Sequence, residues 1–185
     1  MIPTIKKAAQ IQGNKVVLRG VDVCDADFIY SLRIDSKKSA YLSVVDPDVQ
    51  KQLDWIRTYL AGEGQAYFII CDRNLNRLGT VRLYQAIGTS FSWGSWIIKD
   101  GAPTSTAIES ALLVYEYAIN YLGFTSAHFE VDRDNKSVWS YHERFGAKRV
   151  RETERQYFYE IGINDIRSSL NRYKKFLPNE IRVIT

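Results

Sequence analysis

At 185 residues, with 45% hydrophobic and 25% charged residues, the chain is long enough for one domain with a buried core and unlike a disordered, collagen-like or disulfide-scaffold protein. Its net charge of +4 comes from scattered charges of both signs, which disfavours a nucleic-acid partner. No apolar run reaches the ~18 residues of a membrane helix and the first residues lack a secretory signal, so we expect a soluble cytoplasmic protein with no membrane partner.

The first part of the chain is predicted to alternate between strand and helix. Residues 15–21 form a β-branched run typical of a strand, and apolar residues at helical spacing predict a helix over 25–33. A second helix is expected to open at Asp46-Pro47-Asp48, because proline and acidic residues suit a first helical turn, and to end at Gly62.

Three consecutive strands follow. Residues 65–72 and 78–85 are predicted to form a hairpin, and 91–100 a third strand of the same meander. Trp93 and Trp96 are three residues apart, so a regular strand would place them on opposite faces, whereas Gly94 between them indicates a bulge or a close backbone approach.

The longest periodic segment predicts a helix over 106–122, ended by Gly123. Thr106 and Glu109 have the spacing of a capping box, in which each side chain bonds a backbone N–H of the first turn.

The last part of the chain adds a strand over 126–134, a short helix over 135–146, two strands over 147–163 and a helix over 164–176. We therefore expect one domain over 1–162 and a C-terminal helical extension over 163–185, packed on the domain or on a partner subunit. If the extension packs on a partner subunit, the protein is a homodimer.

This order of elements, with two sequence segments, resembles the GCN5-related N-acetyltransferase (GNAT) family. The first segment is WIIKD with the loop and long helix after it; the second is FEVDRDNKSVWSYHERFGAKRV, which is similar to the family pattern LEVxxxNxxAxxLYEKxGFxxxG at Asn135, Glu143 and Gly146. The resemblance implies an α/β (α+β) GNAT fold, with a mixed, mostly antiparallel central sheet of about seven strands, helices on both faces and an extra C-terminal helix.

The resemblance also implies acetyl-CoA as cosubstrate. In the family a loop of the form Gln/Arg-x-x-Gly-x-Gly/Ala wraps the pyrophosphate, and Ala102, Ser105 and Ala107 stand at its positions here, so the motif is altered. Ser105, Thr106 and Ala107 remain candidates because small residues at a helix N-terminus expose N–H donors to a phosphate. The alternative for this segment is an ordinary helix cap.

By the same resemblance, a gap between the fourth and fifth strands receives the pantetheine arm. Ile97 and Ile98 would pair with it through their backbone, and Asn135 would bond or position it.

The family's usual tyrosine, which protonates the departing thiolate, is replaced here by His142. We predict that His142 serves as the acid and also borders the cosubstrate, because imidazole donates a proton near neutral pH. Tyr141, immediately before it, is a second catalytic candidate, although its position also fits core packing. A solvent-facing or capping role for His142 is the alternative.

A general base is predicted less specifically. Glu130, Asp100 and Tyr84 are candidates, and for each a solvated or packing role is the alternative. Two histidines and two cysteines without ligand spacing predict no metal site.

The acceptor site is expected to involve five residues, since positive groups suit a nucleotide diphosphate and aromatic rings suit a sugar or base. They are Arg33, Tyr41, Tyr84, Trp93 and Trp96, with Lys37 and Lys38 nearby.

The segment 31–60 resembles the branch of the family that contains ribosomal-protein-type N-terminal acetyltransferases and bacterial nucleotide-sugar N-acetyltransferases. The resemblance implies acetyl transfer to a primary amine of a small molecule, with an amino sugar on a nucleotide carrier, as in glycan biosynthesis, ahead of a protein N-terminus. A catalytically inactive acyl-CoA-binding or interaction module is the alternative from another class.

Overall fold

The computed structural model describes residues 2–35, 41 and 48–185, and in this part of the chain nine strands form a single sheet. The strand order is β7-β8-β6-β5-β4-β3-β2-β1-β9, and every pairing is antiparallel except that of β5 with β6. The strands are β1 (Gln10–Gln12), β2 (Val16–Gly20), β3 (Ala66–Asp72), β4 (Arg77–Ile87), β5 (Ser90–Ile98), β6 (Ser126–Asp132), β7 (Lys148–Glu152), β8 (Gln156–Gly162) and β9 (Arg182–Ile184).

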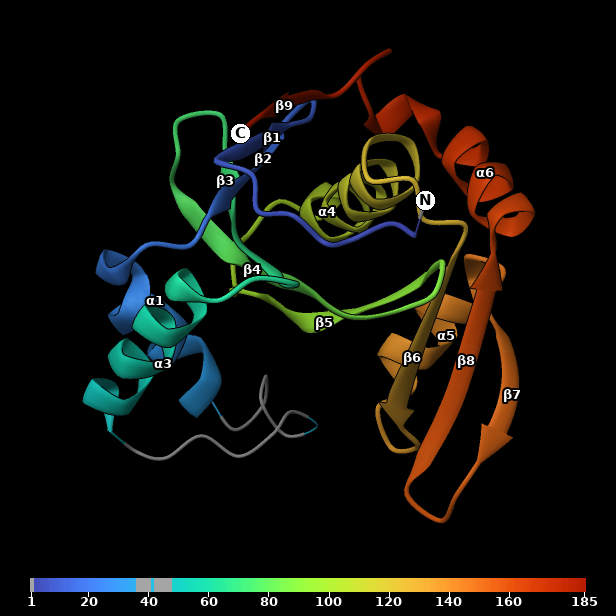
Figure 1. Cartoon of the computed structure of the whole chain (residues 1–185), viewed down its shortest axis with the longest axis horizontal. Helices are drawn as coiled ribbons and strands as arrows, with labels where there is room; N and C mark the ends of the chain where they lie inside the picture. The colour runs from blue at the N-terminus through green and yellow to red at the C-terminus, as the bar shows by residue number, and fades with distance from the viewer. Residues whose placement is uncertain (1, 36–40, 42–47) are drawn as a thin grey trace.

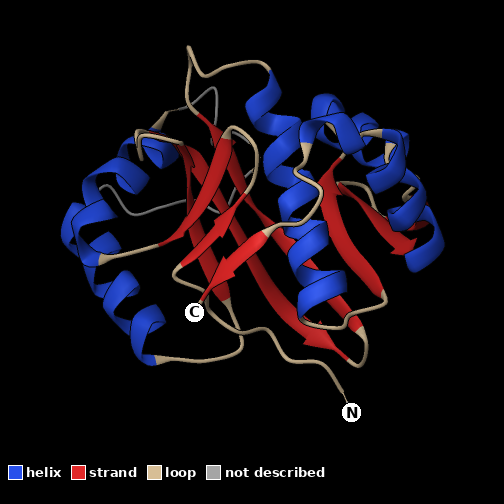
Figure 2. Cartoon of the chain, turned by 90° about the horizontal axis from the view of Figure 1, so that it is seen from above, coloured by secondary structure: helices blue, strands red, loops and turns tan. Residues whose placement is uncertain are grey.

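Helices cover both faces of this sheet (Figures 1 and 2). Short helical turns at Val23–Asp25, Tyr117–Tyr121 and Lys174–Phe176 accompany them. The α-helices are α1 (Ala26–Ile34), α3 (Val49–Ala61), α4 (Ser105–Glu116), α5 (Lys136–Arg144) and α6 (Ile163–Arg172). The mixed, mostly antiparallel sheet with helices on both faces and a further C-terminal helix is thus confirmed. None of the described helices is long and apolar enough to cross a bilayer.

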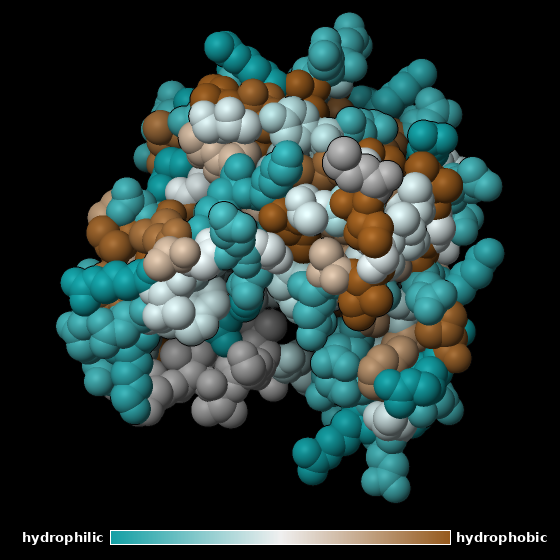
Figure 3. Space-filling view, in the orientation of Figure 1, coloured by the Kyte–Doolittle hydropathy of each residue, from teal (hydrophilic) through white to brown (hydrophobic). Residues whose placement is uncertain are grey.

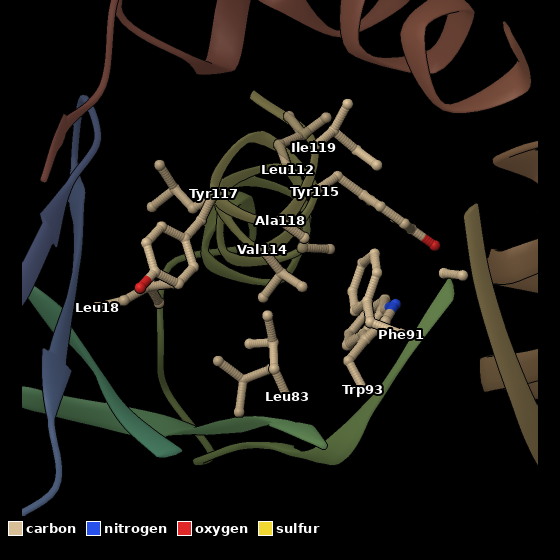
Figure 4. Packing of buried hydrophobic residues seen from close by; sticks show 14 of the residues in the cluster. Leu18, Leu83, Phe91, Trp93, Leu112, Val114, Tyr115, Tyr117, Ala118 and Ile119 are labelled. Atoms are coloured by element: carbon tan, nitrogen blue, oxygen red, sulfur yellow. The ribbon is translucent and has the colours of Figure 1, made fainter. Parts of the chain in front are cut away.

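Two apolar clusters hold the layers together. The larger lies where the sheet curves around α4, and Figure 4 shows Leu83, Phe91 and Trp93 pointing from the strands toward that helix. The smaller joins α1 and α3 to the opposite face through residues such as Ile29, Ile56 and Tyr67. Because side chains alternate along a strand, β2 and β3 contribute to both clusters, whereas the buried residues of β4 and β5 in these clusters belong to the larger one.

The predicted elements are found with shifted ends. Asp48 caps α3 by accepting from the Gln50 N–H, whereas Asp46 and Pro47 lie outside the described residues. The predicted helix over 164–176 is divided into α6 and a separate short turn. The sheet has nine strands among the described residues, and not the expected seven. The two additional strands, β1 and β9, have three residues each and are too short to show an alternation of apolar and polar residues. β9 pairs with β1, so the C-terminal extension joins the sheet.

The predicted capping box at Thr106 and Glu109 is wrong. The cap residue of α4 is Thr104, and its side chain makes no capping hydrogen bond. Glu109, only 1% exposed, instead accepts from the backbone N–H groups of Lys15 and Val16, at 2.8 and 3.1 Å. A buried carboxylate therefore connects α4 to the start of β2, where it satisfies two N–H donors.

A bulge in β5 overturns the expectation that Trp93 and Trp96 face opposite ways. The pairing with β4 shifts so that two residues, Ser95 and Trp96, stand opposite one, and Ser95 takes a left-handed φ of 48°. The extra residue turns Trp96 to the same face as Trp93, and their ring centroids lie 5.4 Å apart. The close backbone approach suggested by Gly94 is observed too, because a Cβ there would lie 2.8 Å from the Tyr84 hydroxyl.

β5 and β6 diverge after a short contact. They pair only at Ser90 with Ser126 and at Phe91 with Ala127, although β5 continues to Ile98 and β6 to Asp132. Beyond this point none of the described strands pairs with the edge of β5 that faces β6. The sheet is thus divided into a larger part that ends at β5 and a smaller part made of β6, β8 and β7 (Figure 1).

Candidate active site

The unpaired edge of β5 exposes backbone groups to the space beside β6. The Ile97 carbonyl is directed toward β4, since a Cβ on Gly79 of β4 would lie 2.1 Å from that oxygen. The Lys99 N–H also points to β4, where it donates to the Leu78 carbonyl at 2.8 Å. Backbone groups alternate in direction along a strand. Ile98, and not Ile97, therefore presents its N–H and C=O toward the divergence.

α4 begins close to this edge and is tied to it. The Trp96 indole N–H donates to Ser110 Oγ at 3.1 Å, and Ser110 Oγ donates to the Ala107 carbonyl at 2.9 Å. Ser105 and Ala107 are half-buried, whereas Thr106 is buried and its N–H donates to the Pro103 carbonyl at 2.9 Å. The bulge thus holds the N-terminus of α4, with its positive dipole end, beside the open edge of β5.

Aromatic side chains fill the wedge where β5, α4, α5 and β6 meet. The His142 ring lies 4.0 Å from that of Phe129 and 5.2 Å from that of Trp93, and Tyr141 lies 5.0 Å from Trp96. In this wedge four buried polar atoms have no hydrogen-bond partner among the described residues. They are Trp93 Nε1, Tyr115 Oη, Tyr141 Oη and His142 Nδ1. Such a concentration of unsatisfied groups is typical of a site that a ligand or water completes.

His142 is 5% exposed, and this burial lowers the pKa of its imidazole to about 3. The side chain is therefore neutral at pH 7 and offers a neutral N–H, not the imidazolium proton that the sequence led us to expect. Burial also raises the pKa of Tyr141 well above its ordinary value, so its hydroxyl stays protonated. Both candidates are neutral hydrogen-bonding groups in this environment.

Asn135 and Glu143 lie at the two ends of α5. Asn135 is the cap residue, and its Oδ1 accepts from Ser137 Oγ at 3.2 Å. Glu143 Oε1 accepts from the Tyr159 hydroxyl at 2.7 Å and from Arg149 at 3.1 Å. The Glu143 of the sequence pattern therefore ties α5 to β7 and β8, whereas Asn135 is half-buried at the end nearer the tip of β6.

The face of the sheet opposite α4 carries the remaining candidates. Glu130 is exposed and alternates with the buried Phe129, so it points away from the wedge. Tyr84 is half-buried on the same face, where it covers Gly94. Figure 3 shows a hollow in the molecule between the part that carries α1 and α3 and the part that carries β6, β8 and β7.

The predicted acceptor residues do not all meet. Arg33 is half-buried near the end of α1, and its charge acts on Tyr67 and Arg82 of the sheet. Tyr41 is 44% exposed, and Lys37 and Lys38 lie outside the described residues. Trp93 and Trp96 belong to the wedge, on the face opposite Tyr84.

Two residues of these regions were missed from the sequence. Tyr115 of α4 enters the wedge with its hydroxyl, yet it reads as one more apolar position of an amphipathic helix. Arg82 of β4 lies on the face of Tyr84, with its guanidinium carbon 5.2 Å from that ring centroid. The available signal was an arginine inside the otherwise apolar run LGTVRLYQ, two positions before Tyr84.

Comparisons with known proteins agree with this geometry. The family model of the acetyltransferase (GNAT) domain matches residues 15–148. The solved structure described as apo FdhC, a nucleotide-linked sugar GNAT, is 37% identical, with a TM-score of 0.80 over 91% of this chain and 98% of that one. A search of curated proteins gave no match.

Two more distant structures share the fold alone. A GCN5-related N-acetyltransferase from Brucella melitensis is 14% identical, with a TM-score of 0.77 over 97% of this chain and 90% of that one. The spermidine/spermine N-acetyltransferase SpeG from Vibrio cholerae is 16% identical, with a TM-score of 0.68 over 85% and 98%. The matched domain and the 37% identical structure together show that the chain belongs to the GNAT family of acetyltransferases.

Proposed function

We propose that this acetyltransferase moves the acetyl group of acetyl-CoA to the primary amine of an amino sugar carried on a nucleotide. The observation that supports this acceptor is the 37% identity to a nucleotide-linked sugar GNAT over nearly the whole of both chains. In the proposed complex the pantetheine arm lies along the unpaired edge of β5 and pairs with the backbone of Ile98. Ser105 and Ala107 at the start of α4 border the pyrophosphate.

The proposed reaction is a direct transfer. The neutral amine nitrogen attacks the thioester carbonyl carbon, a C–N bond forms, the C–S bond breaks and coenzyme A leaves as the thiolate. Glu130, on the face opposite the wedge, takes the proton that the amine loses, directly or through water. The neutral donors of the wedge, Tyr141 and His142, stabilise the charge on the carbonyl oxygen and the sulfur.

Two measurements test this proposal. Acetyl-CoA and free CoA are expected to raise the melting temperature, because a ligand that binds only the folded state stabilises it. Release of the CoA thiol is then followed with nucleotide-linked amino sugars, peptides with free N-termini and spermidine as acceptors. We expect the highest kcat/KM for a nucleotide-linked amino sugar.

The matched control is the nucleotide-linked sugar with a hydroxyl in place of the amine, for which no thiol release is expected. A higher kcat/KM for a peptide or for spermidine would overturn the proposed acceptor. Absence of any shift with the two CoA species would overturn the proposed cosubstrate site.

A further inference from the structure

A positively charged side chain contacts two aromatic rings on the sheet face opposite α4. Arg82 alternates with the core residue Leu83 of β4, so it points toward the side of α1 and α3. Its guanidinium carbon lies 4.9 Å from the ring centroid of Trp55 and 5.2 Å from that of Tyr84. These contacts hold the planar group in one place by cation–π attraction.

The hydrogen bonds of Arg82 leave most of its donors available. Nε and one terminal nitrogen both donate to Gln65 Oε1, a neutral oxygen. A guanidinium has five N–H groups, and the ion pairs among the described residues do not include Arg82. By contrast Arg77, on the same strand and over the Phe28 ring, lies 3.6 Å from a carboxylate oxygen of Asp25.

A buried hydroxyl without a partner lies beside this cation. Tyr67 of β3 is 2% exposed, and among the described residues its Oη has no hydrogen-bond partner. Burial raises the pKa of Tyr67, whereas Arg33, the Thr80 side chain and Arg82 act in the opposite direction. Arg82 stands directly opposite Tyr67 in the pairing of β3 with β4, so the two side chains are neighbours on one face of the sheet. The phenol therefore remains protonated and can donate a hydrogen bond on the same face as Arg82.

Together these groups have the chemistry of an oxyanion site. A guanidinium can donate two parallel hydrogen bonds to a phosphate, the Tyr67 hydroxyl can add a third, and the Trp55 ring, 37% exposed, offers a face for a sugar or base. A carboxylate or phosphate bound at this face would also compensate the positive charge of Arg82, which is partly removed from water.

We propose that Arg82 and Tyr67 bind the diphosphate of the acceptor and thereby make the enzyme prefer a nucleotide-linked amino sugar to the free one. This inference rests on the proposed function for the identity of the amine but concerns a different part of the ligand. It assigns substrate selection to the α1 and α3 side of the sheet, away from the wedge.

The first test compares two acceptors, a nucleotide-linked amino sugar and the methyl glycoside of the same amino sugar. Arg82→Gln is expected to lower kcat/KM for the linked acceptor at least about tenfold and to leave kcat/KM for the glycoside unchanged. Arg82→Lys, which keeps the charge but not the fork, should restore part of the loss. Arg77→Gln is the matched control and should change neither value.

The second test does not depend on turnover. Titration calorimetry with UDP, dTDP and inorganic pyrophosphate should detect binding to the wild type, and at least about tenfold weaker binding to Arg82→Gln. Tyr67→Phe, which removes only an unpartnered hydroxyl, should weaken binding as well and serves if Arg82→Gln does not fold. Stronger binding of UDP or dTDP than of pyrophosphate would show that the base also contributes.

The two proposals fail in different ways. If no amino sugar is acetylated but a nucleoside diphosphate binds and Arg82→Gln weakens it, the acceptor proposal fails and the Arg82 site stands. If the linked acceptor is acetylated equally well by the wild type and Arg82→Gln, or if none of the three anions binds the wild type, the Arg82 site is overturned.

Discussion

At the scale of single residues, His142 shows how burial changes the chemistry of a group. Because its pKa falls from 6.5 to about 3 on folding, the unfolded chain binds a proton at this residue between those pH values and the folded chain does not. Ionisation of His142 therefore has no effect on stability above about pH 6.5, and it lowers the free energy of unfolding progressively as the pH falls toward 3.

His142→Gln tests this environment. As the pH falls through this window, the free energy of unfolding of the wild type should decrease relative to that of the variant by about 1.4 kcal/mol per pH unit. Urea unfolding at about pH 7, 6 and 5 measures the difference. His128→Gln is the control, because it keeps the His142 contribution in full and removes only that of the half-buried His128, whose pKa burial also lowers. Parallel pH dependences of wild type and His142→Gln would show that the imidazole is not buried as described.

The same reasoning bears on catalysis. A residue that is neutral throughout the physiological range adds no ionisation near pH 6.5 to the dependence of kcat on pH. The replacement of tyrosine by histidine at this position of the family pattern thus keeps a neutral hydrogen-bonding group in the wedge.

At the scale of elements, the close contact of β4 and β5 sets the position of the wedge. A methyl group on Gly79 would lie 2.1 Å from the Ile97 carbonyl oxygen, which is backbone and has little room to move. Gly79→Ala should therefore lower the free energy of unfolding by at least about 2 kcal/mol and disturb the bulge. Urea unfolding gives the first quantity, and the intensity of the tryptophan fluorescence reports on Trp93 and Trp96.

Gly162→Ala provides the control, because nothing lies within 4 Å of the added methyl group and its φ of −86° suits any residue. It should stay within about 0.5 kcal/mol of the wild type. Equal stability of the two variants would mean that β4 and β5 are not as close as described.

Elements with a long run of regularly spaced apolar residues could be predicted from the sequence. Features whose geometry depends on residues far away in the chain could not. The apolar repeat of α4 and the buried run of β3 carry their own signals. The bulge at Ser95 depends on the pairing with β4. The spacing of Thr106 and Glu109 fits a capping box, but the sequence does not show that Glu109 instead bonds the backbone of Lys15, 94 residues away. For the candidate site, the segment from Asn135 to Gly146 carries the family pattern in the sequence itself. The placement of Arg82 beside Tyr67 depends on which strands are neighbours, and the sequence does not show this.

At the scale of the whole molecule, the two outer strands of the sheet are protected differently. β7 is exposed along its whole length and carries charged side chains, which discourage pairing with another chain. At the other edge, β9 covers β1, whose residue Ile11 is fully buried. β9 thus pairs the backbone groups along the edge of β1 and leaves a strand of only three residues at this end of the sheet.

Removal of residues 178–185 should expose the edge of β1 and promote association. We expect a lower free energy of unfolding and an average mass that rises with concentration faster than that of the full-length chain, measured by light scattering after size exclusion. In the truncated chain, Gln10→Lys with Gln12→Lys should restore the behaviour of the full-length chain, because lysine on an edge strand opposes pairing. Unchanged mass after truncation would show that β9 does not protect this edge.

The divergence of β5 and β6 also affects how the two parts of the sheet are joined. Only two residue pairs join these strands along the backbone, and the side chains of the larger apolar cluster hold the two parts together beyond them. In the proposed complex the pantetheine amides add rungs to this incomplete ladder, and the cosubstrate becomes part of the sheet. In this complex, coenzyme A leaves only after its hydrogen bonds to the backbone of β5 have broken, so the rate of product release depends on how often these bonds open. Bound CoA should therefore slow amide hydrogen exchange at Ile98.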